Sequence, residues 1–563
     1  MKKITKWLSF LLAIAFGLSA TGCDSGDKID ETKTQLYVNI YYAGLGDEWI
    51  NNYADAFEEF YKDYEFEPGT GKKGAEVIID YSYASGMDTV TGLANSRAEV
   101  IWAENTPYHQ LILNDLALNI SDITSTPLSE FGETKSIEEK IDPSMLSYYK
   151  AYDNNVYAIP HFDYIRCVIY DVDVFEGKLT NGNGFYIAQD GGFTTGLDGQ
   201  PKKSYGPDNQ PNTYDDGLPA TYEEFFDMLN QMVKMGITPF TWPGQYADAD
   251  AITKNLWANF EGNEMSYNYT FRGLATDLVD IGADGQVIRR EPLELTDANA
   301  YQIFHQEGRY RALQFTQKLV SESRYYSDFA FSPSHSHVQA TEEFLYNVTP
   351  RDQRFAMLVS GVWWEEEADD IFTSLEQINA AYGKENRRFA IMPMPHYNNE
   401  YSNDNYYSGE KSKIGNQQTL VLDTQTVVYI NKNIAPEKED IAKKFLRFTS
   451  SDDSIIGHLE SISVPRSLNL SGDQPLEEVA TNMTNYARSV LEFRENANIV
   501  APYSENRFQW SVNTDMGFGN FRSFYSPVFT LKEHPEITPK EYFEGVAEYN
   551  AGMWQNWLES YLK

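Results

Sequence analysis

The chain has little cysteine, few basic residues and almost no long apolar runs. Only two cysteines occur among 563 residues, Cys23 and Cys167. Cys167 stands among apolar neighbours, which predicts a buried and unreactive thiol, so no disulfide is expected. Lys and Arg number 45 against 83 Asp and Glu, a net charge of −38. A protein this acidic is repelled by phosphate backbones, and nucleic acid is therefore excluded as an expected partner.

The one conspicuous apolar run lies at the N-terminus, over residues 7–18. Three lysines precede it, and small residues at 20–22 stand directly before Cys23. This order is typical of an export signal over residues 1–22, and the run is shorter than the roughly 20 apolar residues that span a bilayer. The cysteine resembles that of a bacterial lipobox, although Ala20 stands where Leu is more usual; the alternative is a plain signal peptide with an incidental cysteine.

The lipobox resemblance implies a mature protein that begins at Cys23 and is lipid-anchored on the outer face of the cell membrane. Durable anchoring needs two or more acyl chains, such as palmitate. Residues 23–34 are then expected to form a tether. A lipid-anchored receptor of this kind suits a Gram-positive envelope, which has no enclosed periplasm to retain a soluble protein.

Strand and helix patterns alternate in the first part of the folded chain. Residues 35–42 and 77–83 predict strands, Asp47 is a candidate cap for a helix over 48–61, and 100–102 predicts a short strand. This alternation is typical of an α/β lobe with a largely parallel sheet, in which ligands bind beyond the carboxyl ends of the strands. The residues at those ends are Tyr42, Asp47, Trp102, Glu104 and Asn105.

The segment 101–123 reads IWAENTPYHQLILNDLALNISDI. It resembles the corresponding part of family 1 extracellular solute-binding proteins, the maltodextrin and oligosaccharide receptors of ABC importers. Further segments match that family in the same order along the chain: DNNVYAIP at 153–160, PATYEE at 219–224, RFAMLVSGVWW at 354–364, FAIMPMP at 389–395, IAKKFLRF at 441–448 and SVPR at 463–466. The resemblance covers nearly the whole mature chain.

The resemblance implies an α/β fold of the periplasmic-binding-protein type, with two lobes, three interlobe crossings and a ligand cleft between the lobes. We expect residues 35–158 and 394–462 in the N-terminal lobe. Residues 159–393 and 463–563 are expected in the C-terminal lobe.

The same resemblance assigns ligand-binding positions. Trp102, Glu104 and Asn105 match positions that contact sugar in relatives, with a core role as the alternative for Trp102. Asp163, just after the first crossing, matches a hydrogen-bonding position, and Trp242 is a second aromatic candidate. Trp363 matches the aromatic that stacks on sugar, and its neighbour Trp364 is expected to point the opposite way. Tyr42 and Asp47 complete the predicted site. The acidic run 365–367 is interpreted as a solvated helix start.

Residues 177–218 depart from the family pattern as a glycine- and aspartate-rich insertion. Asp198, Asp208, Asp215 and Asp216 are oxygen ligands of the kind that calcium takes, but their spacing fails the EF-hand pattern. A solvated insertion is the preferred interpretation and a calcium site the alternative. No other metal or cofactor is expected.

The sequence thus predicts a non-enzymatic, monomeric receptor that captures a carbohydrate by hinge closure and delivers it to ABC transporter permease subunits. Aromatic faces are abundant, with 39 Tyr and 10 Trp, and they suit amphipathic ligands. The alternatives are a lipid-anchored glycoside hydrolase, for which nothing places two carboxylates together, and a receptor for a peptide or other solute on the same fold.

Overall fold

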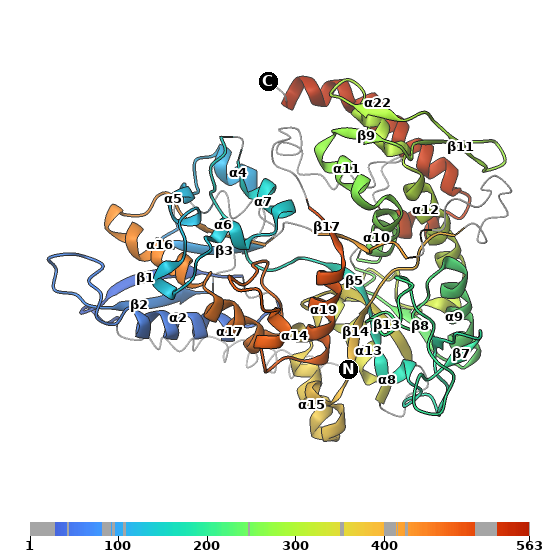
Figure 1. Ribbon diagram of the computed structural model, residues 1–563, viewed down its shortest axis with the longest axis horizontal. Helices are drawn as coiled ribbons and strands as arrows, with labels where there is room; N and C mark the ends of the chain where they lie inside the picture. The colour runs from blue at the N-terminus through green and yellow to red at the C-terminus, as the bar shows by residue number, and fades with distance from the viewer. Residues whose placement is uncertain are drawn as a thin grey trace, which may run out of the picture.

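The computed structural model describes residues 29–41, 44–81, 92, 96–104, 108–151, 153–245, 248–348, 354–398, 413, 415–422, 426–501 and 526–561. Two lobes lie side by side along the longest axis of the molecule (Figure 1). The expected export signal, the lipidation candidate Cys23 and the site candidates Tyr42 and Asn105 lie outside the described residues.

The N-terminal lobe is built on a five-stranded sheet in the order β2-β1-β3-β16-β4. Its strands are β1 (Thr34–Asn39), β2 (Ala75–Asp80), β3 (Val100–Glu104), β4 (Ile159–Pro160) and β16 (Thr426–Ile430). β2 and β3 run parallel to β1, whereas β16 is antiparallel to β3 and β4. Nearly all residues of β3 and β16 are buried, as in a sheet that is covered on both faces.

Helices α2 (Glu48–Phe60), α4 (Tyr108–Leu113), α5 (Ser121–Thr124), α6 (Ile137–Lys140), α7 (Pro143–Tyr149), α16 (Glu439–Phe448) and α17 (Asp452–Ile462) belong to this lobe. The helical spacing of apolar residues places α2 correctly, and α2 buries Trp49, Tyr53 and Phe57. Phe57 packs edge to face on Phe445 of α16, with ring centroids 5.0 Å apart. Segments from opposite ends of the chain thus share one core.

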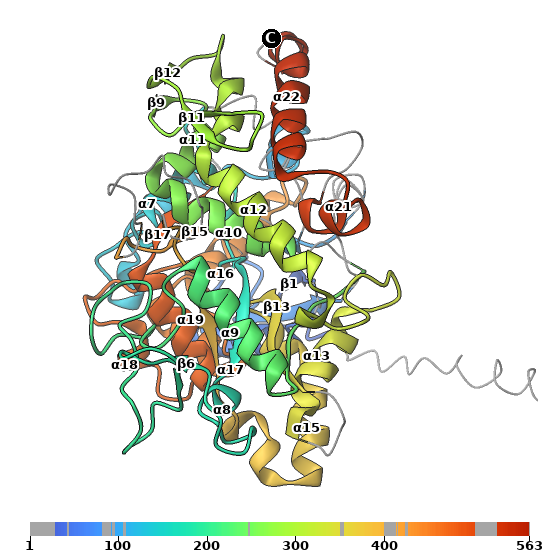
Figure 2. The same ribbon diagram turned by 90° about the vertical axis from the view of Figure 1, so that its right-hand side faces the viewer.

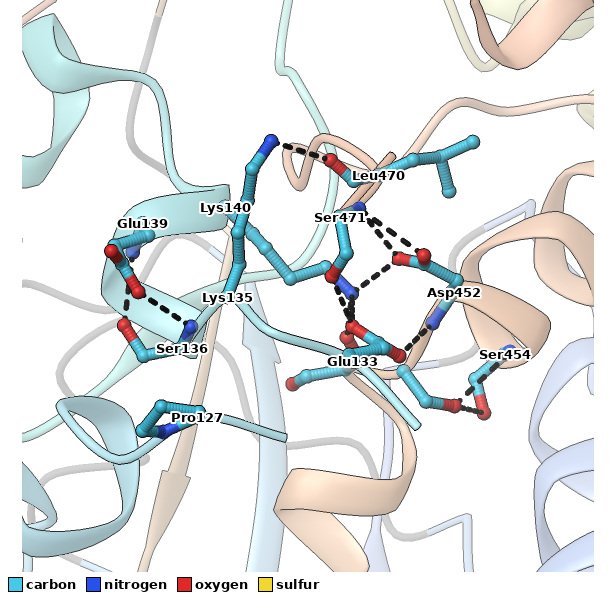
Figure 3. A network of polar contacts seen from close by, with 12 residues as sticks. Pro127, Glu133, Lys135, Ser136, Glu139, Lys140, Asp452, Ser454, Leu470 and Ser471 are labelled. Atoms are coloured by element: carbon cyan, nitrogen blue, oxygen red, sulfur yellow. Dashed lines mark hydrogen bonds and ion pairs between the residues drawn. The ribbon is translucent and has the colours of Figure 1, made fainter. Parts of the chain in front are cut away.

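A buried ion-pair network joins α6 to the start of α17 (Figure 3). Lys140 has no exposed surface, and its ammonium group bonds the carboxylates of Glu133 at 2.6 Å and Asp452 at 2.7 Å. The Ser450 carbonyl accepts a third hydrogen bond at 2.7 Å, so all three ammonium donors are used. Ser471 donates to Glu133 at 2.5 Å, which holds the chain beyond α17 on this lobe.

The C-terminal lobe is built on a four-stranded sheet in the order β14-β5-β13-β8. Its strands are β5 (Arg166–Asp171), β8 (Thr238–Thr241), β13 (Phe355–Gly361) and β14 (Phe389–Met392). β13 is parallel to β8 and antiparallel to β5, which is also antiparallel to β14.

The longer helices of this lobe are α9 (Tyr222–Lys234), α10 (Asp250–Glu261), α12 (Glu307–Ser321), α13 (His337–Leu345), α15 (Asp369–Ile378), α19 (Asn485–Asn496), α21 (Pro527–Glu533) and α22 (Pro539–Tyr561). α9 begins with the capping box that the sequence predicts, in which the Glu224 backbone amide donates to Thr221 Oγ1 at 3.1 Å. α22 packs beside α12 at the outer end of the lobe (Figure 2).

The remaining elements are short: α8 (Val172–Phe175), α11 (Tyr267–Thr270), α14 (Trp364–Glu367), α18 (Leu476–Val479), β6 (Tyr186–Ile187), β7 (Phe193–Thr194), β9 (Gly273–Ala275), β10 (Val279–Ile281), β11 (Val287–Arg289), β12 (Leu293–Leu295), β15 (Thr419–Val421) and β17 (Asn498–Val500). Within the described part of the chain, no helix combines the length and the hydropathy that a membrane crossing needs.

Among the described residues, those at the N-terminal-lobe ends of three connections between the two sheets lie close together. The first follows β4, the second precedes β16 and the third follows α17. Thr426 Oγ1, on the first residue of β16 where the second connection ends, donates to the Phe162 carbonyl of the first at 3.0 Å. Arg466 Nε of the third donates to the His161 carbonyl of the first at 2.7 Å. The three connections are therefore hydrogen-bonded to one another where they leave the N-terminal lobe.

Two lobe boundaries differ from the predicted ones. Residues 394–421 were assigned to the N-terminal lobe, but β15 pairs with β17 and packs on α10 of the C-terminal lobe. Residues 466–471 were assigned to the C-terminal lobe, but they bond to His161 and Glu133 of the N-terminal lobe. The motifs give the order of the crossings, whereas long-range contacts decide where the chain leaves each lobe.

The 177–218 insertion consists of turns and the small β6-β7 hairpin. Its buried carboxylate is Asp215, which accepts hydrogen bonds from the Asp208 backbone amide at 2.9 Å and from Thr213 Oγ1 at 2.8 Å. Burial, more than the nearby Asp208 charge, raises the pKa of Asp215 to about 7. The insertion thus satisfies this carboxylate with its own donors.

The carboxylates named for the calcium alternative differ in their surroundings. Asp198 is exposed, and Asp216 accepts a hydrogen bond from the Asn212 backbone amide at 2.9 Å. Across the described ranges, no three His, Cys, Asp or Glu side chains come together in a group that could hold a metal ion. Asp208, Asp215 and Asp216 stabilise turns of the loop instead.

Candidate functional site

The candidate site is centred on Trp363, at the point where β13 ends in the C-terminal lobe. Gly361 is the last residue of β13, and Trp363 precedes the short helix α14. The indole ring of Trp363 folds back over Gly361, where a Cβ atom would clash with it. Glycine is therefore required at this position because the aromatic ring occupies the space of a side chain.

Trp363 forms a stack with Tyr164 of the first crossing. The ring centroids lie 4.1 Å apart, with an interplanar angle of 29°. The guanidinium carbon of Arg166 lies 4.9 Å from the centroid of the Tyr164 ring and 5.9 Å from that of Trp363. Arg166 Nε pairs with the Asp248 carboxylate at 2.9 Å. Trp363 is partly exposed, whereas Tyr164 is buried beneath it with 5 % exposure, so Trp363 alone presents aromatic surface beside the charged groups.

Glu367 brings the two lobes into contact at this site. It ends α14 in the C-terminal lobe, and its side chain fills the space where a Cβ atom of Gly44 would stand. Gly44 belongs to the loop between β1 and α2 of the N-terminal lobe, and its φ of 81° favours glycine. Burial raises the pKa of Glu367 to about 8, with further contributions from the negative charges of Glu104 and Asp248.

Glu104 lies where the sequence predicts it, at the end of β3, and its charge acts on Glu367. Asp47, also predicted, stands in the loop that Glu367 contacts. It makes no capping bond to α2 and accepts a hydrogen bond from Tyr81 at 3.0 Å. Both residues belong to the N-terminal side of the junction that Trp363 and Glu367 approach from the other lobe.

Trp102 is a core residue, and its predicted role as a sugar platform is wrong for this structure. It has no exposed surface. Its ring packs against Trp49 of α2 and Phe445 of α16, with centroid separations of 5.6 Å and 5.8 Å. Because β3 is an inner strand covered by these helices, position 102 faces the packed interior.

Trp242 is likewise buried, with no exposed surface. Its ring contacts Tyr326 at 5.2 Å and Phe331 at 5.7 Å between centroids. Its carbonyl bonds His335 Nδ1 at 3.1 Å. Trp242 therefore supports the C-terminal lobe and presents no face to a ligand, contrary to the prediction.

Asp163 is in the predicted place along the chain but is not available to a ligand. Its side chain is 2 % exposed and forms an ion pair with Arg494 of α19. Next to it, His161 is fully buried and bonds the Tyr41 hydroxyl through Nδ1 at 2.5 Å. These two side chains fix the first crossing in place, and the ligand contact predicted for Asp163 is wrong for this structure.

The sequence interpretation missed Arg166, Asp248 and Glu367. The run 365–367 was expected to be solvated, yet Glu365 is 3 % exposed and accepts a hydrogen bond from Thr484 at 2.5 Å. For Glu367 the sequence did contain a signal, namely the position of the acidic run 365–367. The run comes directly after the Gly-x-Trp turn of a strand that ends at the site. Arg166 and Asp248 carried no local signal, because their pairing depends on the tertiary fold.

No protein-family model matches the chain, and no curated protein matches its sequence. Solved structures do match over almost the full length. A chitin oligosaccharide binding protein aligns with a TM-score of 0.52 at 11% identity, over 92% of this chain and 99% of that chain. RafE from Streptococcus pneumoniae aligns with a TM-score of 0.52 at 10% identity, over 93% and 99%. Maltose-bound MalE3 of T. maritima aligns with a TM-score of 0.50 at 14% identity, over 92% and 100%.

The chain therefore has the two-lobe α/β fold of periplasmic-type solute-binding proteins. At these identities the likeness establishes the fold alone, and it confirms the fold class that the sequence resemblance predicts. The particular ligand and partners of this chain are matters for proposal.

Proposed function

We propose that this chain is the substrate-binding component of an ABC importer and captures a carbohydrate, an oligosaccharide, between its lobes. The observation that carries the proposal is the Trp363–Tyr164 stack at the junction of the lobes. Flat aromatic rings complement the apolar C–H faces of sugar rings, and charged groups at their edge accept or donate hydrogen bonds to hydroxyls. Neighbours of this fold include a chitin oligosaccharide binding protein, a maltose-bound protein and RafE in complex with raffinose.

Capture proceeds by hinge motion of the two lobes about their three connections. The aromatic pair and Arg166 approach from the C-terminal lobe, while Glu104 and the loop at Gly44 belong to the N-terminal lobe. Polar contacts select the ligand, because a buried donor or acceptor left unpaired costs about 1–3 kcal/mol. The closed form is what the permease subunits recognise. The receptor itself carries out no chemistry.

The proposal is tested by thermal shift and calorimetry on the protein without its export signal. The panel contains chitin oligosaccharides, maltodextrins, raffinose-type sugars and peptides. We expect a carbohydrate to stabilise the protein, since a ligand at 100 times its Kd adds about 2.7 kcal/mol. Stabilisation by peptides alone would refute the carbohydrate proposal. Product analysis after long incubation decides the hydrolase alternative, because cleaved glycosidic bonds would show an enzyme.

The N-terminal order of lysines, apolar run, small residues and Cys23 supports a second part of the proposal. The mature protein is a monomer held by lipid on Cys23 at the outer face of the cell membrane. Such a tether keeps the receptor beside its permease.

A further inference from the structure

Glu367 is the side chain through which the C-terminal lobe rests on the N-terminal lobe at the candidate site. Its Cγ and carboxyl atoms occupy the space above Gly44, a space that only glycine leaves open. Opening of the lobes removes this contact, since Gly44 follows β1 and Glu367 follows β13. The surroundings of this carboxyl group therefore depend on whether the lobes are together.

The charged groups that face Glu367 are mostly acidic. Glu104 at the end of β3 and Asp248 before α10 both act on it. Asp248 is itself paired with Arg166 at 2.9 Å.

The other nearby acids belong to α2 and to α14. At the start of α2, Asp47 bonds Tyr81 and Glu48 is exposed. On α14 itself, Glu365 bonds Thr484 and Glu366 pairs with Lys384 at 2.8 Å.

Glu367 is itself partly exposed to solvent, but it differs from most of these neighbours because it lacks a bonded partner among the described residues. In the described part of the molecule, no ion pair or hydrogen bond is made by its carboxyl group. Arg166 compensates Asp248, but no cation pairs with the carboxylate of Glu367 when it is brought against Glu104 and Asp248. This arrangement is electrostatically unfavourable, and protonation of Glu367 removes the penalty.

We propose that closure of the lobes takes up one proton at Glu367, so that ligand capture by this protein is coupled to pH. The inference rests on the proposed function, because it assigns regulation to the same site. The proton replaces a cationic partner: it neutralises Glu367 when the lobes meet and is released when they separate.

The direction of the coupling follows from the titration of this carboxyl group. With the lobes together, the pKa of Glu367 is about 8, raised first by burial and then by Glu104 and Asp248. With the lobes apart, an exposed glutamate titrates near its ordinary value of about 4.3. A group whose pKa is raised by closure favours closure at low pH. That favourable contribution is lost progressively as the pH rises from the lower value to the higher.

Calorimetry of sugar binding in buffers of different ionisation enthalpy tests the inference. For the full mature protein at pH 7, we expect an uptake of close to one proton per sugar bound. Between pH 6 and pH 8 the affinity should fall by up to about fiftyfold, the ratio that a pKa of about 8 in the closed form produces. Binding without proton uptake, or with affinity that rises with pH, would overturn the inference while leaving carbohydrate binding intact.

Two variants make the test specific. Glu367→Gln keeps the size of the side chain and removes its titration, so its affinity should be independent of pH and its binding should take up no proton. Asp370→Asn removes one negative charge from the exposed start of the neighbouring helix α15 and should retain the full pH dependence of the wild type. Equal pH dependence in both variants would overturn the assignment to Glu367.

A ligand-free measurement separates this inference from the proposed function. If no sugar binds, the proposed function fails, and urea unfolding of the wild type and Glu367→Gln decides the inference alone. We expect the wild type to lose stability relative to Glu367→Gln as the pH rises from 5 to 8. Parallel stability profiles would overturn the inference.

Discussion

Trp363 and Trp364 are adjacent in the chain but have opposite roles. Trp363 is partly exposed and stacks on Tyr164, whereas Trp364 has no exposed surface and packs against Phe344 and Phe389. The turn after Gly361 directs one indole to the junction of the lobes and the other into the core.

This pair gives a matched test of the binding surface. Trp363→Ala should weaken carbohydrate binding by about 2 kcal/mol or more, the scale of an interface hot spot, and leave the fold intact. Trp364→Ala should instead lower the free energy of unfolding by about 3–5 kcal/mol, since it empties a packed core position. Calorimetry and urea unfolding of both variants measure the two effects. Unchanged affinity in Trp363→Ala would make that residue structural as well.

The sequence predicts three tryptophans as sugar platforms, and the structure leaves one of them accessible. In the sequence, Trp102, Trp242 and Trp363 each end or follow a predicted strand, so local pattern does not distinguish them. What separates them is cover from distant segments: α16 for Trp102 and the loop at Phe331 for Trp242. At Trp363 the local motif itself accounts for the position of the indole ring, because Gly361 leaves room for it.

At the scale of elements, Arg466 links the third crossing to the first. Its guanidinium donates to the carbonyls of His161 at 2.7 Å, Thr449 at 3.0 Å and Pro160 at 3.3 Å, and to the Tyr53 hydroxyl at 2.8 Å. It is 1 % exposed and has only neutral acceptors. One buried side chain thus links the first crossing to Thr449 after α16 and to Tyr53 of α2.

Arg466→Met should therefore destabilise the protein strongly. The variant keeps much of the apolar volume but leaves several buried acceptors without donors, each costing about 1–3 kcal/mol, so a total loss on the order of 3 kcal/mol or more is expected. Chemical denaturation measures it. Arg324→Met is the matched control, because Arg324 is exposed and, among the described residues, its ion pair is with Glu322, two positions earlier in the chain. A similar loss in both variants would contradict a special role for the crossing.

Local sequence signals predict single elements well and contacts between elements poorly. Helical spacing places α2, although its predicted cap Asp47 makes no capping bond, and the capping box places the start of α9. β13 with its terminal glycine is visible as a motif. The partial burial of the acidic run 365–367 cannot be predicted from local sequence. It depends on Thr484 and Lys384, which belong to other parts of the chain. The two misplaced lobe boundaries have the same cause.

At the scale of the whole molecule, the order of weak motifs is more informative than any one of them. Several short matches in the family's order predict two lobes joined by repeated crossings, and the solved structures of that fold align over more than nine-tenths of the chain. The composition adds a constraint on the ligand. With a net charge of −38 and acidic groups facing the junction, we expect neutral solutes to bind better than anionic ones.

A two-lobe receptor with a lipid-modified N-terminus should depend on that lipid for transport and not for binding. Cys23→Ala removes the thiol proposed to take the acyl chains, so we expect the protein to be released into the medium with unchanged sugar affinity, while uptake by cells falls. Cell fractionation, calorimetry and uptake of labelled sugar measure the three effects. Cys167→Ala is the control, since Cys167 is buried in the folded body and its loss should leave the protein on the membrane. Undiminished uptake by Cys23→Ala cells would mean that the receptor reaches its permease without a tether, and retention on the membrane would show that Cys23 is not the anchor.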